Sequence, residues 1–381
     1  MREPRPTGAV NDILERALEG RAPTARGIER LLAPAPAGEG AWSEREALFR
    51  VARELRRRHF GDRVFLYGFL YLSTFCRNDC AFCWYRRSNA ACRRYRKRDE
   101  EVLEAAGRLA DSGVHLLDLT LSEDPGLRTV AGFEGLVRLT ARIKEATGLP
   151  LMLSPGLVTA SQLRELRRAG ADWYACYQET HSWPLFRRLR PGQSFRARMA
   201  AKRAARRAGL LLEEGVLCGA GVGRRQLARS VRAMGRLGAE QVRVMSFVPR
   251  EGIPLAARFR GDRERELAAI AALRLAFPDR LIPASLDVDG IEGLARRLEA
   301  GANVVTSLIP PGHGLAGVAQ SELDIEEGRR SVAEVCEVLA RCGLEAASRQ
   351  QYAGWLEQRR REARAVRSGA RRGVSAAVGT A

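Results

Sequence analysis

The sequence predicts an α/β protein built as a (β/α)8 TIM-type barrel with an N-terminal helical extension. From Arg63 onward, short apolar runs rich in β-forming residues alternate with amphipathic helical stretches, and eight such units follow one another. Gly170, Gly209 and Gly301 each stand between a helical stretch and the next apolar run, where helices commonly end. A doubly wound open sheet is the main alternative, because it is built from similar units.

The barrel is expected to occupy residues 63–345. Helical stretches follow the strands, for example at residues 100–111, 133–146 and 194–208. The expected strands are residues 64–74, 116–121, 150–154, 173–178, 210–217, 241–247, 281–286 and 303–308.

The two ends of the chain are expected to differ from the barrel. Residues 1–62 should form the helical extension, with helices near 11–18 and 43–60. Ser43 and Glu46 have the spacing of a capping box, so the second helix is expected to begin there. Residues 346–381 form a C-terminal segment, and its arginine-rich tail from Gln358 onward is expected to be disordered.

Composition bears on location and partners. Hydrophobic residues make up 45% of the chain, which suffices for a large core, and no apolar run approaches the roughly 20 residues of a membrane span. The N-terminus lacks the apolar segment of a secretory signal. We therefore expect a cytoplasmic protein with no membrane partner.

The net charge of +19 raises the question of nucleic acid. Nearly all the basic residues are arginine, with lysine only at Lys97, Lys144 and Lys202, a pattern that indicates biased codon composition. Nucleic-acid binding would predict an appended module or patches that mix aromatic and basic residues, and none is visible. A solvated basic surface is the preferred interpretation, and no nucleic-acid partner is expected.

The main chemical motif is formed by Cys76, Cys80 and Cys83, spaced C-x3-C-x2-C directly after the first expected strand. Three thiolates in one loop can ligate three irons of a [4Fe–4S] cubane and leave the fourth iron open. S-adenosylmethionine can chelate that iron, and an electron from the cluster then yields a 5′-deoxyadenosyl radical. A zinc site is the alternative, but closed zinc sites normally take four ligands, and no second cysteine or histidine pair is present.

The chain also resembles a known family in several blocks. The run FLYGFLYLSTFCRNDCAFCWYRRSN at residues 65–89 is similar to the cluster loop of methylornithine synthase, the first enzyme of pyrrolysine biosynthesis. That enzyme belongs to the biotin-synthase and hydrogenase-maturase branch of radical S-adenosylmethionine enzymes. The likeness covers roughly residues 45–345. Its further blocks include DLTLSEDP (118–125), LMLSPGL (151–157), YQET (177–180), LRPGQSF (189–195), VRVMSFVPREGIPL (242–255), LIPASLDVDGIEG (281–293) and AGANVVTSLIPP (300–311).

The resemblance implies a reaction. L-lysine would be isomerised to (3R)-3-methyl-D-ornithine through fragmentation to a glycyl radical and an aminoalkene, which recombine with a new branch. The cofactors would be a [4Fe–4S] cluster and S-adenosylmethionine, reduced by an external electron donor such as flavodoxin or ferredoxin. The alternative is another small-molecule radical S-adenosylmethionine reaction, biotin-synthase-like or hydrogenase-maturase-like.

Polar residues in the expected strands match such a substrate. Lysine carries one carboxylate and two ammonium groups, and unpaired buried charge is costly. Asp118 and Arg243 interrupt otherwise apolar strands, and Ser285 and Asp287 end the seventh strand with side chains expected on one face. We expect Arg243 to bind the carboxylate, and Asp118, Ser285 and Asp287 to hold the amines. The alternative is an internal Asp118–Arg243 salt bridge without a ligand.

The resemblance further implies residues for S-adenosylmethionine. Ser154 follows the third strand, Glu179 ends the fourth, and Arg198 lies in the helix after it. Glu179 would take a ribose hydroxyl or the amino group, and Arg198 the methionine carboxylate. Glu123 lies in a loop that resembles the one meeting the methionine amino group, although ordinary turn chemistry explains its Asp-Pro pair equally well.

Two aromatic residues lie beside the third cysteine. The resemblance implies that Phe82 packs on the adenine, with Tyr85 nearby, and core packing is the alternative for both. Arg188 and Arg190 are interpreted as surface residues and receive no role.

Overall fold

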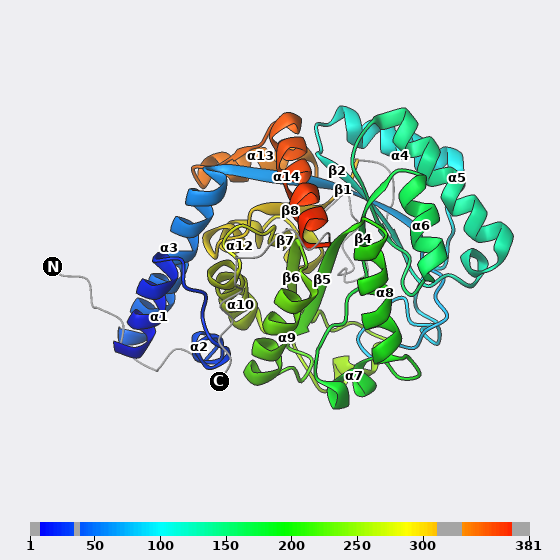
Figure 1. Ribbon diagram of the computed structural model, residues 1–381. Helices are drawn as coiled ribbons and strands as arrows, with labels where there is room; N and C mark the ends of the chain where they lie inside the picture. Colours follow the sequence, from blue (N-terminus) through cyan, green and yellow to red (C-terminus); the bar gives the residue numbers. More distant parts are fainter. Residues whose placement is uncertain (1–7, 34–38, 311–329, 368–381) are drawn as a thin grey trace.

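The computed structural model describes residues 8–33, 39–310 and 330–367, and its centre is a barrel of parallel strands wrapped by helices (Figure 1). Hydrogen-bonded neighbours run in the order β6-β5-β4-β3-β2-β1-β8-β7. The barrel strands are β1 (Arg63–Ser73), β2 (Leu116–Leu121), β3 (Leu151–Ser154), β4 (Ala171–Ala175), β5 (Leu211–Cys218), β6 (Gln241–Ser246), β7 (Pro283–Ser285) and β8 (Val304–Leu308).

The two ends of this sheet nearly meet. Gln241 in β6 forms a parallel bridge with Leu281 just before β7, and the Val242 N–H donates to the Leu281 carbonyl at 3.0 Å. The predicted (β/α)8 barrel is therefore confirmed, and the open doubly wound sheet is excluded.

Helices connect successive strands and cover the outside of the barrel (Figure 1). Short 3-10 helices, η1 (Pro125–Arg128) and η2 (Pro254–Ala257), lie in two of the loops. The helices of the barrel region are α4 (Asp99–Asp111), α5 (Val130–Thr147), α6 (Ala160–Arg168), α7 (Trp183–Leu189), α8 (Phe195–Arg207), α9 (Arg224–Leu237), α10 (Arg263–Ala276), α11 (Leu286–Asp289), α12 (Leu294–Glu299) and α13 (Val332–Arg341).

Strand alternation separates two hydrophobic cores. Tyr67, Phe69 and Tyr71 of β1 belong to the core inside the barrel, whereas Leu66 and Leu70 belong to the layer between strands and helices. This division follows from the two-residue period of a strand. The same period brings polar residues to the interior wherever they replace an inward-facing apolar residue.

The N-terminal helices are α1 (Gly8–Leu18), α2 (Ala25–Leu31) and α3 (Glu39–Phe60). They lie along one side of the barrel, with α3 packed on α10 and α2 on α9 (Figure 1). The predicted capping box is wrong, because α3 begins at Glu39 and Ser43 lies inside the helix.

The C-terminal helix α14 (Arg349–Arg367) lies across the end of the barrel where the strands begin (Figure 1). Trp355 stacks on Trp173 with ring centroids 5.9 Å apart, and the Tyr352 hydroxyl meets that of Tyr67 at 2.8 Å. A short strand β9 (Glu345–Ala346) precedes α14 and pairs with β1. The helix therefore closes this end of the barrel with aromatic side chains.

The expectation of a disordered tail is wrong for its first part. Residues 358–367 continue α14, and Arg359 is anchored by an ion pair with Asp279 at 2.7 Å. Amphipathic spacing, with Tyr352 and Leu356 buried, outweighs the high charge that suggested disorder. Residues 368–381 lie outside the described residues.

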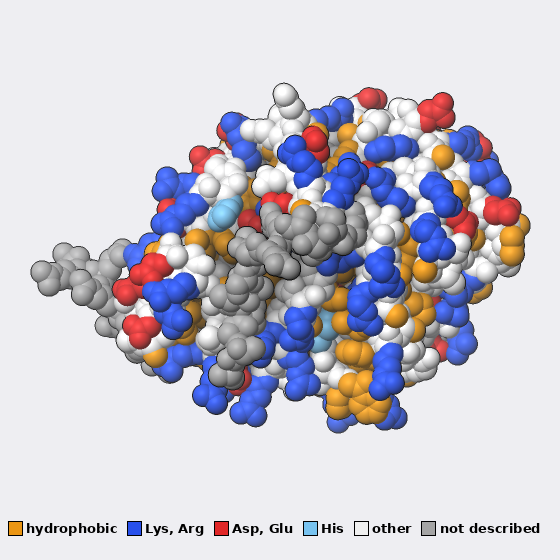
Figure 2. Space-filling view, viewed as in Figure 1, with side chains coloured by type: hydrophobic (Ala, Val, Ile, Leu, Met, Phe, Trp, Pro, Cys, Tyr) orange, Lys and Arg blue, Asp and Glu red, His pale blue; other side chains and the backbone are white. Residues whose placement is uncertain are grey.

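Basic side chains are spread over the face shown in Figure 2, with acidic and hydrophobic side chains among them. None of the described helices combines the length and the apolar character needed to cross a membrane.

Candidate functional site

One cavity lies at the end of the barrel where the strands finish, the usual place for a site in this fold. Ser285 is the one predicted site residue that does not line it. The predicted residues that do are Cys76, Cys80, Cys83, Phe82, Tyr85, Asp118, Glu123, Ser154, Glu179, Arg198, Arg243 and Asp287.

The cysteine loop leaves β1 after Ser73 and is tied down by backbone hydrogen bonds. The Ala81 N–H donates to the Leu189 carbonyl at 2.8 Å, and the Arg77 N–H donates to the Glu123 carbonyl at 3.0 Å. These bonds join the loop to the end of α7 and to the segment after β2. The loop is therefore held over the barrel opening by two neighbouring connections.

The three thiols lie close enough to influence one another. Burial raises the pKa of the Cys83 thiol, and the neighbouring Cys80 and Cys76 raise it further. Within the described part of the chain, no three His, Cys, Asp or Glu side chains converge on a point suited to a single metal ion. A cubane puts each thiolate on a different iron and needs no such convergence, so the three-cysteine loop fits a [4Fe–4S] cluster.

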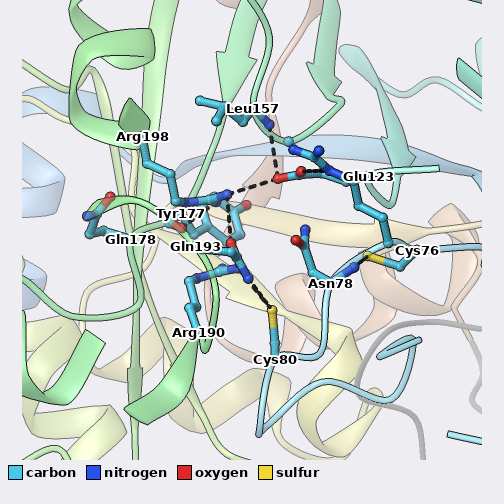
Figure 3. Close-up of polar contacts among 12 residues, drawn as sticks. Cys76, Asn78, Cys80, Glu123, Leu157, Tyr177, Gln178, Arg190, Gln193 and Arg198 are labelled. Atoms are coloured by element: carbon cyan, nitrogen blue, oxygen red, sulfur yellow. Dashed lines mark hydrogen bonds and ion pairs between the residues drawn. The ribbon is translucent and has the colours of Figure 1, made fainter. Parts of the chain in front are cut away.

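Two side chains that the sequence did not single out contact the middle cysteine. Gln193 Nε2 donates to Cys80 Sγ at 3.0 Å, and Arg190 Nη1 donates to the same sulfur at 3.3 Å (Figure 3). The interpretation of Arg190 as a surface residue is wrong, because it is only 9% exposed. Arg190 lies in the LRPGQSF block of the family resemblance, and this position could have indicated a functional role.

A chain of contacts extends from this point to Glu123 (Figure 3). Arg198 Nη1 lies 3.4 Å from Gln193 Oε1 and 3.2 Å from Glu123 Oε1. Glu123 also accepts from Arg77 at 2.9 Å and from the Leu157 N–H at 3.1 Å. Burial alone would raise the pKa of Glu123, but Arg198 and these donors outweigh it and lower the pKa, so the carboxylate stays ionised.

Glu179 has an unusual backbone and a free carboxylate oxygen. Its φ of 64° is in the left-handed region, which costs free energy for a residue other than glycine. Backbone hydrogen bonds with Gly215 and Leu217 of β5 hold this conformation. Its Oε1 accepts from Arg190 Nη2 at 2.8 Å, and its buried Oε2 has no partner among the described residues. The free oxygen is available to a ligand.

Arg243 projects from β6 into the barrel. Its Nε donates to Glu213 Oε1 at 2.7 Å and its Nη1 to Thr306 Oγ1 at 3.2 Å, while Nη2 has no partner among the described residues. Glu213 also accepts from the Tyr177 hydroxyl at 2.7 Å. The predicted alternative of an Asp118–Arg243 salt bridge is wrong, because Glu213 takes that place.

Sequence reasoning missed Glu213, although it stands in the fifth strand. The run LLEEG contains two adjacent acids, and only the pleat of β5 decides which one faces the interior. Its neighbour Glu214 pairs instead with the buried Lys202.

Asp118 lies inside the barrel without an ion-pair partner among the described residues. Its Oδ1 accepts from Thr120 Oγ1 at 3.2 Å and from Ser154 Oγ at 3.3 Å. Burial, followed by the nearby Glu213 charge, raises the pKa of Asp118 to about 8. A buried carboxyl with only hydroxyl donors would be stabilised as a carboxylate by a cationic ligand.

Asp118→Asn should therefore stabilise the protein in a pH-dependent way. The aspartate ionises near pH 4 in the unfolded chain and near pH 8 in the folded one, so its contribution to stability falls as pH rises through this window. The gain in unfolding free energy from Asp118→Asn should grow from near zero at about pH 4 to a few kcal/mol at about pH 8. Urea denaturation across this range measures it.

Asp12→Asn, at an exposed position on α1, is the matched control and should change stability little at any pH. A gain from Asp118→Asn that did not vary with pH would contradict the elevated pKa.

Asp287 is already neutralised within the protein. Arg330 Nη1 lies 2.6 Å from Asp287 Oδ1, and the hydroxyls of Tyr71 and Ser307 donate to the same carboxylate at 3.0 and 2.8 Å. The expected strand alternation of Ser285 and Asp287 is wrong, because β7 ends at Ser285 and Asp287 lies in α11. Ser285 instead caps α11, with Oγ accepting from the Asp287 N–H at 3.3 Å.

The aromatic residues of the cluster loop also line the cavity. The guanidinium of Arg190 lies over the Phe82 ring at 5.1 Å, and the Phe82 side chain is half-buried. Tyr85 is 2% exposed. Phe82 thus presents part of its ring to the cavity, whereas Tyr85 lies almost wholly within its wall.

Comparisons with known proteins identify the family. The radical SAM superfamily matches residues 70–233, a span that contains the three cysteines. The chain is 42% identical to 3-methylornithine synthase of Methanosarcina acetivorans over 309 residues, which cover 81% of this chain and 87% of that protein. This chain belongs to the methylornithine synthase family. The corresponding enzyme of Methanosarcina barkeri is 43% identical over 302 residues, or 79% of this chain and 85% of that one.

A solved structure agrees with this assignment. The crystal structure of methylornithine synthase (PylB) superposes with a TM-score of 0.84 at 40% identity, covering 90% of this chain and 99% of that chain. The [FeFe] hydrogenase maturase subunit HydE of Thermotoga maritima is 30% identical over 263 residues, which cover 68% of this chain and 74% of that protein. The chain is thus a radical S-adenosylmethionine enzyme, and its family implies S-adenosylmethionine and an iron–sulfur cluster.

Proposed function

We propose that this enzyme isomerises L-lysine to (3R)-3-methyl-D-ornithine, the first step of pyrrolysine biosynthesis. One observation carries the proposal beyond the family name. The unpaired Asp118 carboxyl and the Arg243 guanidinium, with its free Nη2, line the same buried cavity as the three thiols. An acidic group without an ion-pair partner among the described residues and a guanidinium with one free nitrogen match a small zwitterion with an additional amine.

The substrate charges would be distributed as follows. Arg243 receives the carboxylate, because its planar fork offers a donor pair suited to two oxygens. Asp118 receives one ammonium group, whose charge replaces the missing partner of the carboxyl. Asp287 holds the other amine more weakly, because Arg330 already matches its charge. Ser285 would not contact the substrate; it caps α11 and so helps to position Asp287.

Glu213 gives Arg243 a defined orientation. By accepting from Nε at 2.7 Å, it leaves the far edge of the guanidinium directed away from the wall of β5. Because Glu213 is fully buried and also accepts from Tyr177 and Gln241, its own position has little freedom. The carboxylate site is therefore preorganised before substrate arrives.

The cofactors would occupy the part of the cavity next to the cysteine loop. Cys76, Cys80 and Cys83 would hold the [4Fe–4S] cluster, which together with S-adenosylmethionine supplies a 5′-deoxyadenosyl radical for hydrogen abstraction. The residues we assign to S-adenosylmethionine are Phe82 and Tyr85 at the adenine, Glu179 at the ribose or amino group, Arg198 at the methionine carboxylate, and Glu123 and Ser154 near the methionine end.

The barrel itself would keep the substrate fragments in place. Aromatic side chains of α14 pack against the start of the strands and cover the far end of the barrel. Charged contacts at both ends of lysine hold its fragments near one another, which favours recombination over loss. An external one-electron donor such as flavodoxin or ferredoxin would supply the electron, and the reaction would take place in the cytoplasm.

An anaerobic assay tests the proposal. Protein reconstituted with iron and sulfide is incubated with dithionite, S-adenosylmethionine and L-lysine, and the products are separated by chiral chromatography before mass spectrometry. We expect a lysine isomer that co-elutes with authentic methylornithine, because substrate and product have equal mass.

Other outcomes have separate meanings. Cleavage to 5′-deoxyadenosine without an isomer would retain the radical class but refute lysine as the substrate, leaving another small-molecule reaction of this branch. No cleavage by protein with an intact cluster would refute the proposed chemistry.

A further inference from the structure

The segment from Leu189 to Gln193 forms a turn that rests against the cysteine loop. It begins where α7 ends, and the Leu189 carbonyl accepts the Ala81 N–H at 2.8 Å, directly beside Cys80. The turn ends before Ser194, which caps α8 by accepting from the Ala197 N–H. A structured connection between two helices thus touches the proposed cluster site.

The turn directs two side-chain donors at one sulfur. Gln193 Nε2 and Arg190 Nη1 lie 3.0 and 3.3 Å from Cys80 Sγ (Figure 3). Cys76 Sγ accepts a backbone N–H from Asn78 in its own loop, at 3.5 Å. Cys80 therefore differs from Cys76 in receiving amide and guanidinium donors from a remote part of the chain.

The donors are held in place by further contacts. Arg190 bonds Glu179 through Nη2 at 2.8 Å and stacks over Phe82. Gln193 Oε1 lies 3.4 Å from both Arg190 Nη1 and Arg198 Nη1, which orients the amide with its nitrogen toward the sulfur. Arginine stays protonated in proteins, so one of the two donors of the turn is a cation.

Hydrogen-bond donors to a ligating sulfur change the reduction potential of an iron–sulfur cluster. Hydrogen bonds and positive charge at a ligating sulfur stabilise the more electron-rich, reduced cluster, and hydrogen bonding to the sulfurs is one of the factors that set reduction potentials. Charge-assisted bonds are the stronger class. The effect here would fall on one of the three ligands.

We propose that Arg190 and Gln193 are positioning residues that raise the reduction potential of the cluster by hydrogen bonding to the Cys80 thiolate. This inference rests on the proposed cluster assignment. It deepens that assignment, because a higher reduction potential would make the cluster easier to reduce by the external donor.

The test compares reduction potentials of variants of the full chain after cluster reconstitution, in redox titrations followed by electron paramagnetic resonance without S-adenosylmethionine. Gln193→Leu removes the amide donor. We expect the equilibrium constant for cluster reduction to fall about tenfold, which equals about 59 mV for a one-electron couple. Gln193→Glu keeps the shape and the contacts with arginine but replaces the donor with an anion, so its potential should fall further.

Ser194→Ala is the matched control. It removes the cap of α8 beside the turn without touching the sulfur, and it should leave the potential unchanged. A shift in Ser194→Ala equal to that in Gln193→Leu would show that loop distortion is responsible, and would overturn the inference. Unchanged potentials in both Gln193 variants would overturn it as well.

The proposed function fails in a different way. If wild-type protein assembled no [4Fe–4S] cluster, the cluster assignment itself would be refuted before any potential was compared. If the cluster formed and the potentials shifted, but lysine gave no isomer, the inference would stand and the substrate assignment would fall.

Discussion

Arg243→Ala should abolish lysine turnover while leaving the protein able to cleave S-adenosylmethionine slowly. Removing one partner of a buried, hydrogen-bonded charge pair between protein and ligand costs about 2–5 kcal/mol, which corresponds to roughly one and a half to four orders of magnitude in kcat/KM. Arg243 forms its ion pair with Glu213 and leaves Nη2 free, and none of its hydrogen bonds among the described residues reaches a cluster cysteine. Reductant-dependent 5′-deoxyadenosine and the lysine isomer are measured in the same reaction.

A stability measurement and one further variant help to interpret this result. Arg243→Ala leaves Glu213 buried without its cation, so a thermal unfolding scan must show that the barrel persists. Arg243→Lys retains the charge but not the planar fork, and should recover part of the binding with a raised KM. If cleavage of S-adenosylmethionine disappeared together with lysine turnover in folded Arg243→Ala, the residue would belong to the cofactor site.

Cys80→Ala should eliminate all reductant-dependent chemistry. With only Cys76 and Cys83 remaining, the [4Fe–4S] cluster loses one of its three protein ligands, and a second iron is left without a cysteine. We expect iron and sulfide contents to fall, the cluster signal in electron paramagnetic resonance to vanish, and 5′-deoxyadenosine production to drop to background. Circular dichroism should still report the α/β fold, because the loop contributes no strand to the barrel.

Cys336→Ala is the control for cysteine loss in general. Cys336 lies in α13, outside the cavity lining, and its replacement should leave cluster content and turnover unchanged. Retention of a normal cluster and full activity in Cys80→Ala would refute the cluster assignment. Equal loss in both variants would point to nonspecific oxidation damage.

Much of the fold was predictable because apolar periodicity is a local property. The expected second strand matches Leu116–Leu121, and the other strands agree within a few residues. The largest boundary error is in the fourth strand, which was expected to reach residue 178 and ends at Ala175. The seventh strand was expected to reach residue 286 and ends at Ser285. At the end of β7, Ser285 caps α11, and the sequence pattern did not reveal this change from strand to helix.

The site was predictable where a residue type was itself unusual in its setting. Asp118 and Arg243 interrupt apolar strands, and all but one of the predicted residues line the cavity. Arg190 was missed because arginine is common along the whole chain, so another arginine in a loop carries little information. Its burial and its contact with Cys80 exist only once α7 has brought the turn against the cysteine loop.

The barrel, the three-cysteine loop and the positions of Asp118 and Arg243 in strands can be predicted from the sequence alone, because these features depend on spacing along one segment. The tertiary structure decided the pairings. Arg243 meets Glu213 rather than Asp118, and Arg330 neutralises Asp287, because such contacts join strands and loops distant in the chain. Whether a buried ionisable group finds an ion-pair partner is therefore a property of the assembled barrel, and among the described residues the carboxyl of Asp118 finds none.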